Sequence, residues 1–412
     1  MARTKAVFKE DGQGGGFMSL GSLMGAVPEE AASAALEEFG LATIRQRKLP
    51  LELMVYYVIS MALYSDVSQM EVLRKLMEGS SALKLGLSAE PLKCRGGIVK
   101  ARERLGADVM RSLFENLRAT RTSCRTKGAR YKNWRLAAID GSTLDLPDTA
   151  ANRAHFGTPG ASGGKAAFPQ LRFAALVEVG AHIIFGAEYG PCGESESSLA
   201  QKLLRKLEPG MLLLADRGFG GHPFFSAAAQ TGADLLIRVK NNMILPCHER
   251  LPDGSYLSKL HPAAEPRRDA EAPGGIPVRV IRYNLADGDG ENFGEDYALI
   301  TTILDPARAP AKELAALYHE RWEIEETYGE LKTRLKLPGT RLRSKTPMLV
   351  EQEFYGFLLA HSAVRLLMLQ AARRESCDPD ELSFKTAVSI ITRKITAARF
   401  PPKPAGTEES PR

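Results

Sequence analysis

The periodicity of the apolar residues changes along this chain, and that change most limits the folds available to it. From Ser19 to Leu117 the pattern is helical throughout. After residue 135, apolar runs of strand length such as LAAID (136–140) and MLLLAD (211–216) alternate with amphipathic helical segments and Gly- or Pro-rich turns. Alternating strands and helices predict a central mixed sheet with helices packed on it. The sequence therefore predicts an all-α N-terminal domain followed by an α/β domain.

A further change of pattern begins at residue 241. Residues 241–296 are rich in Pro, Gly and short β-like pieces, which predicts a β-rich insertion. The sheet pattern returns in DYALITTIL (296–304). A long helix is then expected from about Ala311 to Leu335, and two more helices are expected over 347–374 and 383–398.

Positive charge is concentrated in two runs that contain no acidic residue. The chain has a net charge of +6, and the segment from Arg118 to Arg135 holds seven basic residues. The second run holds Lys332, Arg334, Lys336, Arg341, Arg343 and Lys345. Either run alone is equally typical of a solvated linker. Two such runs that flank a carboxylate-bearing domain favour binding to a phosphate backbone.

The cysteines and the apolar stretches argue against secretion and against a membrane. The five cysteines (Cys94, Cys124, Cys192, Cys247 and Cys377) form no CxxC pair, which predicts free thiols in a reducing cytosol. The N-terminal residues have no apolar core, so no signal peptide is expected. The most apolar stretches, 49–65 and 354–370, are short or broken by charge and are interpreted as buried helices. We expect a soluble protein.

Two aspartates follow apolar strand-like runs. Asp140 ends LAAID and Asp216 ends MLLLAD, and each precedes a Gly-containing turn. The C-terminal ends of strands are where open sheets present functional side chains. A lone aspartate at such a position is more often a cap or an Asx-turn residue. That alternative weakens when two such strands lie in one sheet, because their ends can converge.

A third group of charged residues lies on the long predicted helix. Its members share one face, within an arc of about 60° at about 100° per residue: Tyr318, Arg321, Glu325 and Lys332. Taken alone, this face is more typical of a solvated surface stabilised by pairs such as Arg321–Glu325. Combined with Asp140 and Asp216, it predicts a site for phosphodiester chemistry.

Three carboxylates suit that chemistry for a physical reason. They can hold two Mg²⁺ or Mn²⁺ ions about 3.5–4 Å apart, one beside the attacking oxygen and one beside the leaving oxygen. Carboxylate oxygens are the ligands that these hard cations prefer. The basic side chains of Arg321 and Lys332 can bind neighbouring phosphates through charge-assisted hydrogen bonds.

Three motifs resemble those of the DDE transposases of bacterial insertion sequences, in the subgroup with a Tyr-Arg-Glu-Lys signature. The signature matches at Tyr318, Arg321, Glu325 and Lys332, with Trp322 and Ile324 in the usual places. The first aspartate motif is Asp140-Gly141-Ser142, and the second is Asp216-Arg217-Gly218-Phe219. LPDTAANRAHFGTP and the N-terminal phrases RQRKLPLELMVYYV and KARERLG are also similar. The resemblance covers nearly the whole chain.

The resemblance implies a ribonuclease-H-like fold in which Asp140, Asp216 and Glu325 are catalytic and bind two Mg²⁺ or Mn²⁺ ions. It implies that water nicks each transposon end and that the freed 3′-OH then attacks target DNA. Tyr318, Arg321 and Lys332 would contact the phosphates of the transposon end. The implied partners are double-stranded DNA, both terminal inverted repeats and target, and a second protomer in a synaptic complex. The implied location is the bacterial cytoplasm, in association with the nucleoid.

A chain of 412 residues has room for several domains. The expected divisions are residues 1–18, disordered; 19–120, a helical domain that binds DNA ends; 121–345, the catalytic domain with its insertion at 241–296; 346–400, a C-terminal helical region; and 401–412, a disordered tail.

One departure from the family concerns the insertion. Some members that form a DNA hairpin hold a flipped base with a tryptophan there, whereas this chain has only Trp134 and Trp322. A base could stack on another aromatic residue of the insertion region: Tyr256, Tyr283, Phe293 or Tyr297. Each of these is also typical of an ordinary strand aromatic, so the hairpin route stays open.

Other interpretations remain beside the transposase. The helical pair 96–106 and 107–117 is as typical of a plain αα-hairpin as of a helix-turn-helix that enters a DNA groove. A transposase-derived DNA-binding protein without catalysis, a packaging protein that uses only its basic runs, and a stand-alone ribonuclease-H-like nuclease are the alternative functions.

Overall fold

A computed structural model describes most of the chain. The described residues are 23–42, 49–82, 95–117, 126–160, 168–262, 275–284, 296–335 and 341–397. The two segments predicted to be disordered, 1–18 and 401–412, lie outside them, as do Phe293 and the cysteines at 94 and 124. The three described cysteines, Cys192, Cys247 and Cys377, are free thiols, as predicted.

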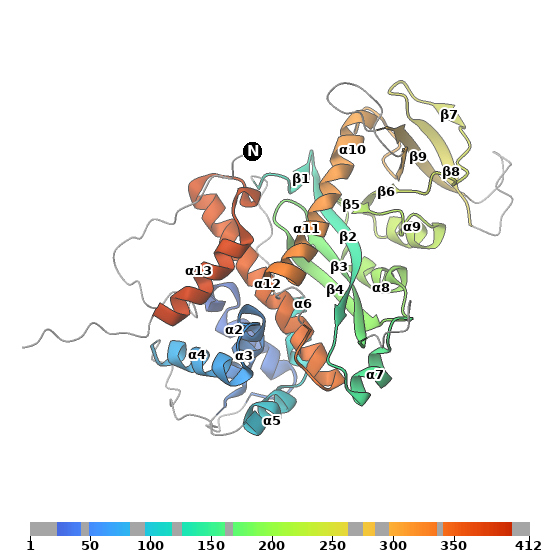
Figure 1. Ribbon diagram of the computed structural model, residues 1–412. Coiled ribbons are helices and arrows are strands. Elements are labelled where there is room, and N and C mark those ends of the chain that lie inside the picture. Colours follow the sequence, from blue (N-terminus) through green and yellow to red (C-terminus); the bar gives the residue numbers. More distant parts are fainter. Residues whose placement is uncertain are drawn as a thin grey trace, which may run out of the picture.

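Five neighbouring strands form one half of the sheet (Figure 1). They are β2 (Trp134–Asp145), β3 (Gln170–Glu178), β4 (Ile183–Pro191), β5 (Met211–Ala215) and β6 (Asp234–Arg238). Their spatial order is β4-β3-β2-β5-β6. The pairs β4–β3 and β3–β2 are antiparallel, whereas β5 and β6 continue parallel to β2. Three antiparallel strands joined to two parallel ones are the ribonuclease-H-like arrangement, so the predicted fold class is confirmed.

Both faces of this sheet are covered by helices, which explains why its central strands are continuous apolar runs. Residues of β2 and β5 alternate between two buried clusters. Ala137, Ile139, Leu213 and Ala215 pack on the face covered by α8 (Glu196–Leu203) and α9 (His222–Ala229). Leu136, Ala138, Leu212 and Leu214 pack on the face covered by α11 (Trp322–Gly329) and α12 (Pro347–Glu375).

The β-rich insertion continues the same sheet. β10 (Tyr297–Thr301) pairs antiparallel with β6, and β9 (Ile276–Tyr283), β8 (Tyr256–Leu260) and β7 (Glu249–Arg250) follow in order. The predicted β-rich insertion is therefore present, and it is joined to the central sheet through β6 and β10. Chain elements far apart in sequence thus share one hydrogen-bonded layer.

The aromatic residues of the insertion region pack on one another. Tyr283 and Tyr297 are directly paired across β9 and β10, and their rings stack with centroids 5.2 Å apart. The guanidinium of Arg238 lies 4.1 Å from the ring centroid of Tyr297. The Tyr256 hydroxyl donates to the Leu245 carbonyl at 3.3 Å. These residues fill the strand-aromatic role, and base stacking by them stays a prediction.

The N-terminal part is a bundle of helices, as predicted. Its helices are α2 (Glu29–Glu38), α3 (Leu51–Leu63), α4 (Gln69–Ala82), α5 (Arg95–Leu105) and α6 (Asp108–Asn116). Helix α3 is buried along most of its length and lies against α12. A turn at Gly106, with φ of 73°, joins α5 to α6, and both helices pack into the bundle. Groove reading by this pair stays a prediction.

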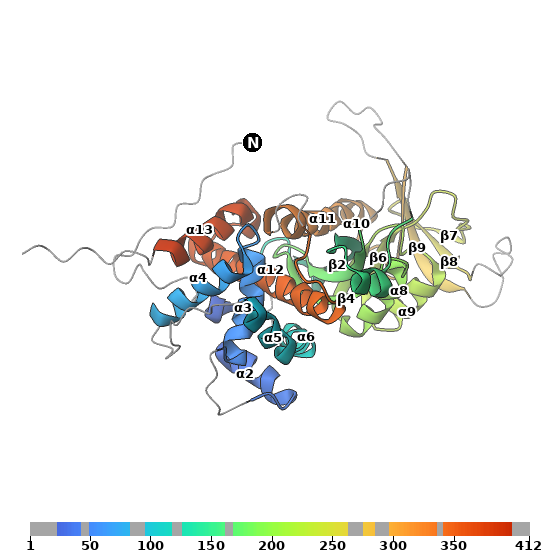
Figure 2. The ribbon, with the colours of Figure 1, turned by 60° about the horizontal axis from the view of Figure 1, so that its bottom comes forward.

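Helix α12 lies between the N-terminal bundle and the sheet (Figures 1 and 2). It is long and apolar enough to cross a membrane, but 83% of its most apolar window is buried within the protein. The N-terminal bundle, β4 and the segment Glu330–Leu335 pack around it, and α13 (Phe384–Ala397) lies beside it. Helix α12 is therefore the shared core element of the molecule.

Arg102 connects α5 to the start of α12. Its side chain is 2% exposed, and it donates to Gln352 Oε1 at 2.8 Å, to Ser344 Oγ at 2.9 Å and to the Leu349 carbonyl at 3.0 Å. A buried acceptor that loses such a donor has no water to replace the hydrogen bond, and the folded state is destabilised. This contact stabilises the docking of the N-terminal bundle on α12.

Replacing Arg102→Ala is expected to lower the free energy of unfolding by about 3 kcal/mol, because it leaves buried polar partners unpaired. Urea denaturation measures the loss. Arg111→Ala is the matched control, because Arg111 is partly exposed and pairs with Glu115 at 3.2 Å; it is expected to cost less than about 1 kcal/mol. Equal losses in the two variants would contradict this account of Arg102.

Candidate active site

Asp140 lies within β2 rather than at its end, which corrects the sequence-based expectation. The strand continues to Asp145 because β3 pairs with it from Ala137 to Asp145. On the other side, the parallel pairing with β5 ends at Ile139 and Ala215. Asp140 and Asp216 are the next residues on the two strands. Both aspartates therefore stand at the point where the two parallel strands part.

Local hydrogen bonds hold both aspartates. Asp140 Oδ1 accepts from the amide of Gly141 at 2.7 Å. Asp216 Oδ1 accepts from the amide of Gly218, two residues on, at 3.3 Å. The second contact is the Asx-turn geometry that was considered as the alternative for a lone aspartate. The turn fixes the direction of the Asp216 side chain, so the turn and a role in the site are compatible.

The long predicted helix is present but changes geometry along its length. It consists of α10 (Ala311–Tyr318), the 3₁₀ turn η2 (His319–Arg321), α11, and the π-helical segment η3 (Glu330–Leu335). The constant 100° per residue on which the predicted helix face depends is broken by both the 3₁₀ turn and the π turn. Lys332 lies in the π-helical segment, a feature frequent at functional sites.

The helix is fixed against β2 beside Asp140. The Tyr328 hydroxyl donates to the main-chain carbonyl of Asp140 at 2.6 Å. Arg321 Nη2 donates to Glu325 Oε1 at 3.1 Å, and Arg321 Nη1 lies 4.0 Å from Asp140 Oδ2. The guanidinium of Arg321 therefore lies between the carboxylates of Asp140 and Glu325. Its carbon Cζ is 5.8 Å from the ring centroid of Tyr318.

Electrostatic interactions connect the remaining predicted residues to this point. Burial raises the pKa of Asp140 to about 6, with Asp216 and Glu196 contributing and with the Gly141 amide and Arg321 opposing. Burial lowers the pKa of Lys332, although Asp140 is among the carboxylates that oppose the shift. All six predicted site residues thus surround one location: Asp140, Asp216, Tyr318, Arg321, Glu325 and Lys332.

The three carboxylates are not in mutual contact. In the described part of the chain, the one trio of His, Cys, Asp or Glu residues with ligand atoms all within 4.8 Å of one another is His182, Glu323 and Asp380. Asp140 and Glu325 are instead held through the shared Arg321 guanidinium. An all-oxygen donor set with a raised aspartate pKa matches hard divalent cations, which supply the missing positive charge.

Arg321 also has hydrogen-bond donors that no described residue uses. Its Nε and Nη1 atoms are buried and have no hydrogen-bond partner among the described residues. Buried donors of this kind normally find a partner, and unpaired ones call for an explanation. A phosphate oxygen matches both the charge and the fork geometry of a guanidinium.

Glu196 belongs to this site and was missed by the sequence analysis. It is the first residue of α8, and a Cβ placed on Gly141 would lie 2.3 Å from its Cγ atom. Its charge acts on Asp140 and on Lys332. The only sequence signal is a glycine directly after Asp140, which permits the close approach. Its partner 55 positions away cannot be read from that signal.

The basic runs are partly used inside the protein. In the first run, Arg135 Nε pairs with the buried Glu178 at 2.7 Å, and residues 118–125 lie outside the described part. In the second run, Arg343 donates to the carbonyl of Val67 at 2.8 Å. The total charge of the runs therefore overstates the charge available to a phosphate backbone, whereas Lys332 lies at the site itself.

The strand order and the clustered side chains define a ribonuclease-H-like protein with an acidic site. A family model for the transposase DDE domain matches residues 134–362, and one for the N-terminal part of insertion element 4 transposases matches residues 17–115. The chain belongs to the DDE transposase family and is a transposase of the insertion-element-4 type, as the sequence resemblance predicted.

Named relatives agree with this assignment. The chain is 30% identical over 374 residues to "Transposase InsG for insertion sequence element IS4" of Escherichia coli (strain K12), across 89% of this chain and 80% of that protein. It is 26% identical over 260 residues to "Putative transposase InsZ" of the same organism, across 62% and 77% of the two chains. A solved structure, "Cryo-EM structure of piggyBac transposase synaptic complex with hairpin DNA", gives a TM-score of 0.46 at 11% identity, across 93% of this chain and 80% of that one.

Gly141→Ala is expected to lower the rate of DNA cleavage by about 10- to 100-fold, because the new methyl group displaces Glu196 from beside Asp140. The initial cleavage rate on DNA that carries the element's ends measures the effect. Gly193→Ala is the control, since a Cβ there meets nothing within 4 Å. In a Glu196→Ala background, Gly141→Ala is expected to add no further loss; a full additional loss would show that Glu196 is not the residue displaced.

Proposed function

We propose that Asp140, Asp216 and Glu325 are the metal-binding catalytic carboxylates of this transposase. The observation that carries the proposal is the end of the β2–β5 pairing at Ile139 and Ala215, directly before the two aspartates. The contact of Arg321 with both Asp140 and Glu325 supports the inclusion of the glutamate. The matching family supports the use of divalent cations, for which we propose two Mg²⁺ or Mn²⁺ ions.

The chemistry supplied by such ions is activation of the attacking oxygen and stabilisation of the leaving oxygen in an in-line displacement. The side chains of this chain have their own parts. The three carboxylates provide negative oxygen ligands at one location. Arg321 offers to a phosphate oxygen its Nε and Nη1 atoms, which are buried and have no hydrogen-bond partner among the described residues. Lys332 and Tyr318 stand on the same helical stretch and contact the phosphates at the transposon end.

The reaction that follows is cleavage of phosphodiesters at the transposon ends and transfer of the resulting 3′-OH into target DNA. The names of InsG and InsZ, both transposases, support this assignment. We infer that residues 19–120 bind the terminal inverted repeats and that residues 346–400 contribute to pairing of two protomers. Residues 121–345, with the insertion at 241–296, form the catalytic unit. The protein acts in the cytoplasm, on DNA of the nucleoid.

Asp140→Ala, Asp216→Ala and Glu325→Ala are each expected to lower the cleavage rate on the order of 10³-fold or more, because each removes a ligand that stabilises transition-state charge by several kcal/mol. Binding to the DNA ends in EDTA is expected to survive. Asp148→Ala is the control, since Asp148 is an exposed partner of Arg153. If Asp140→Ala kept full activity, a packaging role for the basic runs would replace the proposal.

Joining of DNA strands separates a transposase from a stand-alone nuclease. Pre-cut ends with a free 3′-OH are expected to join a plasmid target in the presence of Mg²⁺, because the 3′-OH takes the place of water as the attacking group. Gel analysis of the joined products measures this step.

The matched substrate control for that assay carries a 3′-deoxy end, which is expected to give no joined product. Nicking without joining would indicate a nuclease. Binding without nicking or joining would indicate a transposase-derived protein that lacks catalysis.

A further inference from the structure

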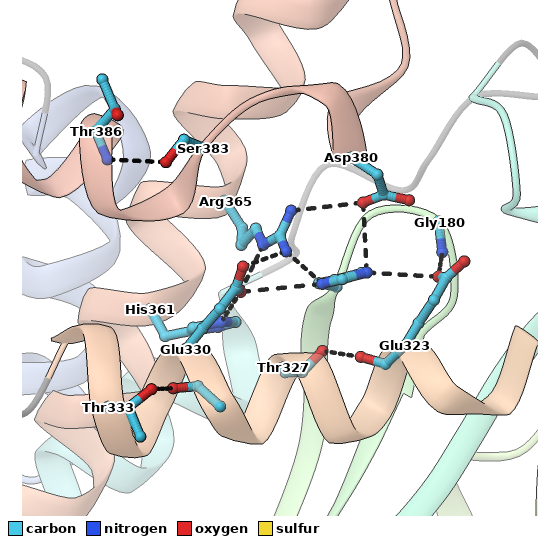
Figure 3. Close-up of polar contacts among 12 residues, drawn as sticks. Gly180, Glu323, Thr327, Glu330, Thr333, His361, Arg365, Asp380, Ser383 and Thr386 are labelled. Atoms are coloured by element: carbon cyan, nitrogen blue, oxygen red, sulfur yellow. Dashed lines mark hydrogen bonds and ion pairs between the residues drawn. The ribbon is translucent and has the colours of Figure 1, made fainter. Parts of the chain in front are cut away.

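A buried ionic cluster joins the helical stretch from Ala311 to Leu335, called the catalytic helix because it carries Glu325, to α12 and to Asp380 (Figure 3). Its centre is Glu330, which is 1% exposed. Arg365 of α12 binds Glu330 with two nitrogen atoms, Nε at 2.8 Å from Oε2 and Nη2 on Oε1. His361, one helical turn earlier on α12, has Nε2 3.0 Å from Glu330 Oε2. The cluster therefore ties the π-helical segment of the catalytic helix to the core helix.

The charge of Glu330 is fully compensated by this arrangement. Burial alone would raise the pKa of Glu330, but the hydrogen bond from His361 and the Arg365 guanidinium, with smaller contributions from the rings of His361 and His182, lower it to about 2. Removing one partner from a buried charge is strongly unfavourable. The Glu330 carboxylate is therefore stable in few other positions. Bidentate binding by the Arg365 guanidinium also restrains the orientation of this carboxylate.

His182 extends the cluster to the turn between β3 and β4. Its main chain is left-handed, with φ of 55°, which is unfavourable for a residue other than glycine and persists only where the surroundings fix it. Arg365 Nη2 contacts His182 Nδ1. On the other side of the ring, His182 Nε2 lies 3.5 Å from Glu323 Oε2 and 3.4 Å from Asp380 Oδ1.

These contacts argue against a metal at His182, Glu323 and Asp380, although their ligand atoms lie within 4.8 Å of one another. A guanidinium can only donate. Because Arg365 donates to Nδ1, the ring proton of a neutral His182 is on Nε2, the atom that faces the two carboxylates. A metal ligand needs a lone pair on that atom. The ring is therefore held by Arg365 at Nδ1, with Nε2 within ion-pair distance of two carboxylates.

The cluster holds the face of the helix that lies opposite the active site. Glu323 and Glu325 are two positions apart, about 200° around a helix at 100° per residue. Glu325 meets Arg321 on the side of Asp140, whereas Glu323 accepts from the Gly180 amide in the β3–β4 turn. Rotation of the helix that moved Glu325 would therefore break the contacts of Glu323 and Glu330.

We propose that Glu330, Arg365 and His182 are positioning residues that fix the rotation of the catalytic helix and so keep Glu325 on the side that faces Arg321 and Asp140. This inference rests on the proposed role of Glu325. Supporting contacts of this kind commonly change metal affinity or activity by ~10–100-fold when removed. All three side chains are buried, so they are expected to act through the helix.

The test compares Glu330→Gln and Arg365→Lys with Glu326→Gln, the same acid-to-amide change at an exposed position of the same helix. The Mg²⁺ concentration for half-maximal cleavage is expected to rise by ~10-fold or more in the first two variants, with a lower single-turnover rate. Binding of end DNA in EDTA is expected to be unchanged. The Glu326→Gln control is expected to match the natural protein in all three measurements.

A double variant, Glu330→Leu with Arg365→Met, guards against loss of folding, because apolar replacement of a buried ion pair is often neutral in stability. It is expected to fold, as judged by urea denaturation, and to retain the altered Mg²⁺ dependence. A double variant with natural Mg²⁺ dependence would show that the pair is merely structural and would overturn the proposal. Natural Mg²⁺ dependence in Glu330→Gln would overturn it as well.

Two further outcomes are distinguishable. If Glu325→Ala retained cleavage, the proposed function would fail and this inference with it. If Glu325→Ala were inactive while Glu330→Gln behaved as the natural protein, only the positioning role would fail. Calorimetric binding of Zn²⁺ or Mn²⁺ that His182→Ala abolished and Asp140→Ala preserved would show that His182 is a metal ligand and would overturn its assignment as a positioning residue.

Discussion

The parallel pairing between β2 and β5, and the place where it stops, determines where the proposed active site lies. The pairing ends at Ile139 and Ala215. One residue further on, β2 continues against β3, whereas the chain after β5 turns through Asp216 and Gly218. The carboxylates of Asp140 and Asp216 therefore lie on neighbouring strands, directly after the last residues that pair β2 with β5. The other residues of the proposed site lie around these two aspartates.

The catalytic helix is held from two sides at once. On the side of the sheet, the Tyr328 hydroxyl binds the main-chain carbonyl of Asp140, so the helix is fixed to the strand that carries the first aspartate. On the other side, Arg365 and His361 bind Glu330. Because α12 also forms the core of the N-terminal bundle, the position of Glu325 depends on packing that reaches across the molecule.

The sequence was sufficient for local and periodic features and insufficient for long-range contacts. The period change, the two aspartate motifs and the helix face predicted the sheet, its class and the side chains that now surround one location. Asp140 was misplaced at a strand end, because the hydrogen-bond partner that prolongs β2 is β3, which the Asp-Gly turn signal does not reveal. Glu196 was missed because its approach to Gly141 is a tertiary contact.

The two sides of the catalytic helix differ in how the charges of their carboxylates are compensated, and this difference supports the proposed catalytic role of Asp140. Glu330 is buried with a guanidinium and imidazole partners, and its pKa falls to about 2. Asp140 is buried among other carboxylates, shares Arg321 with Glu325, and its pKa rises to about 6. A fold retains such an uncompensated carboxylate at a cost in stability. Perturbations of this kind concentrate at functional sites, where a ligand supplies the missing charge.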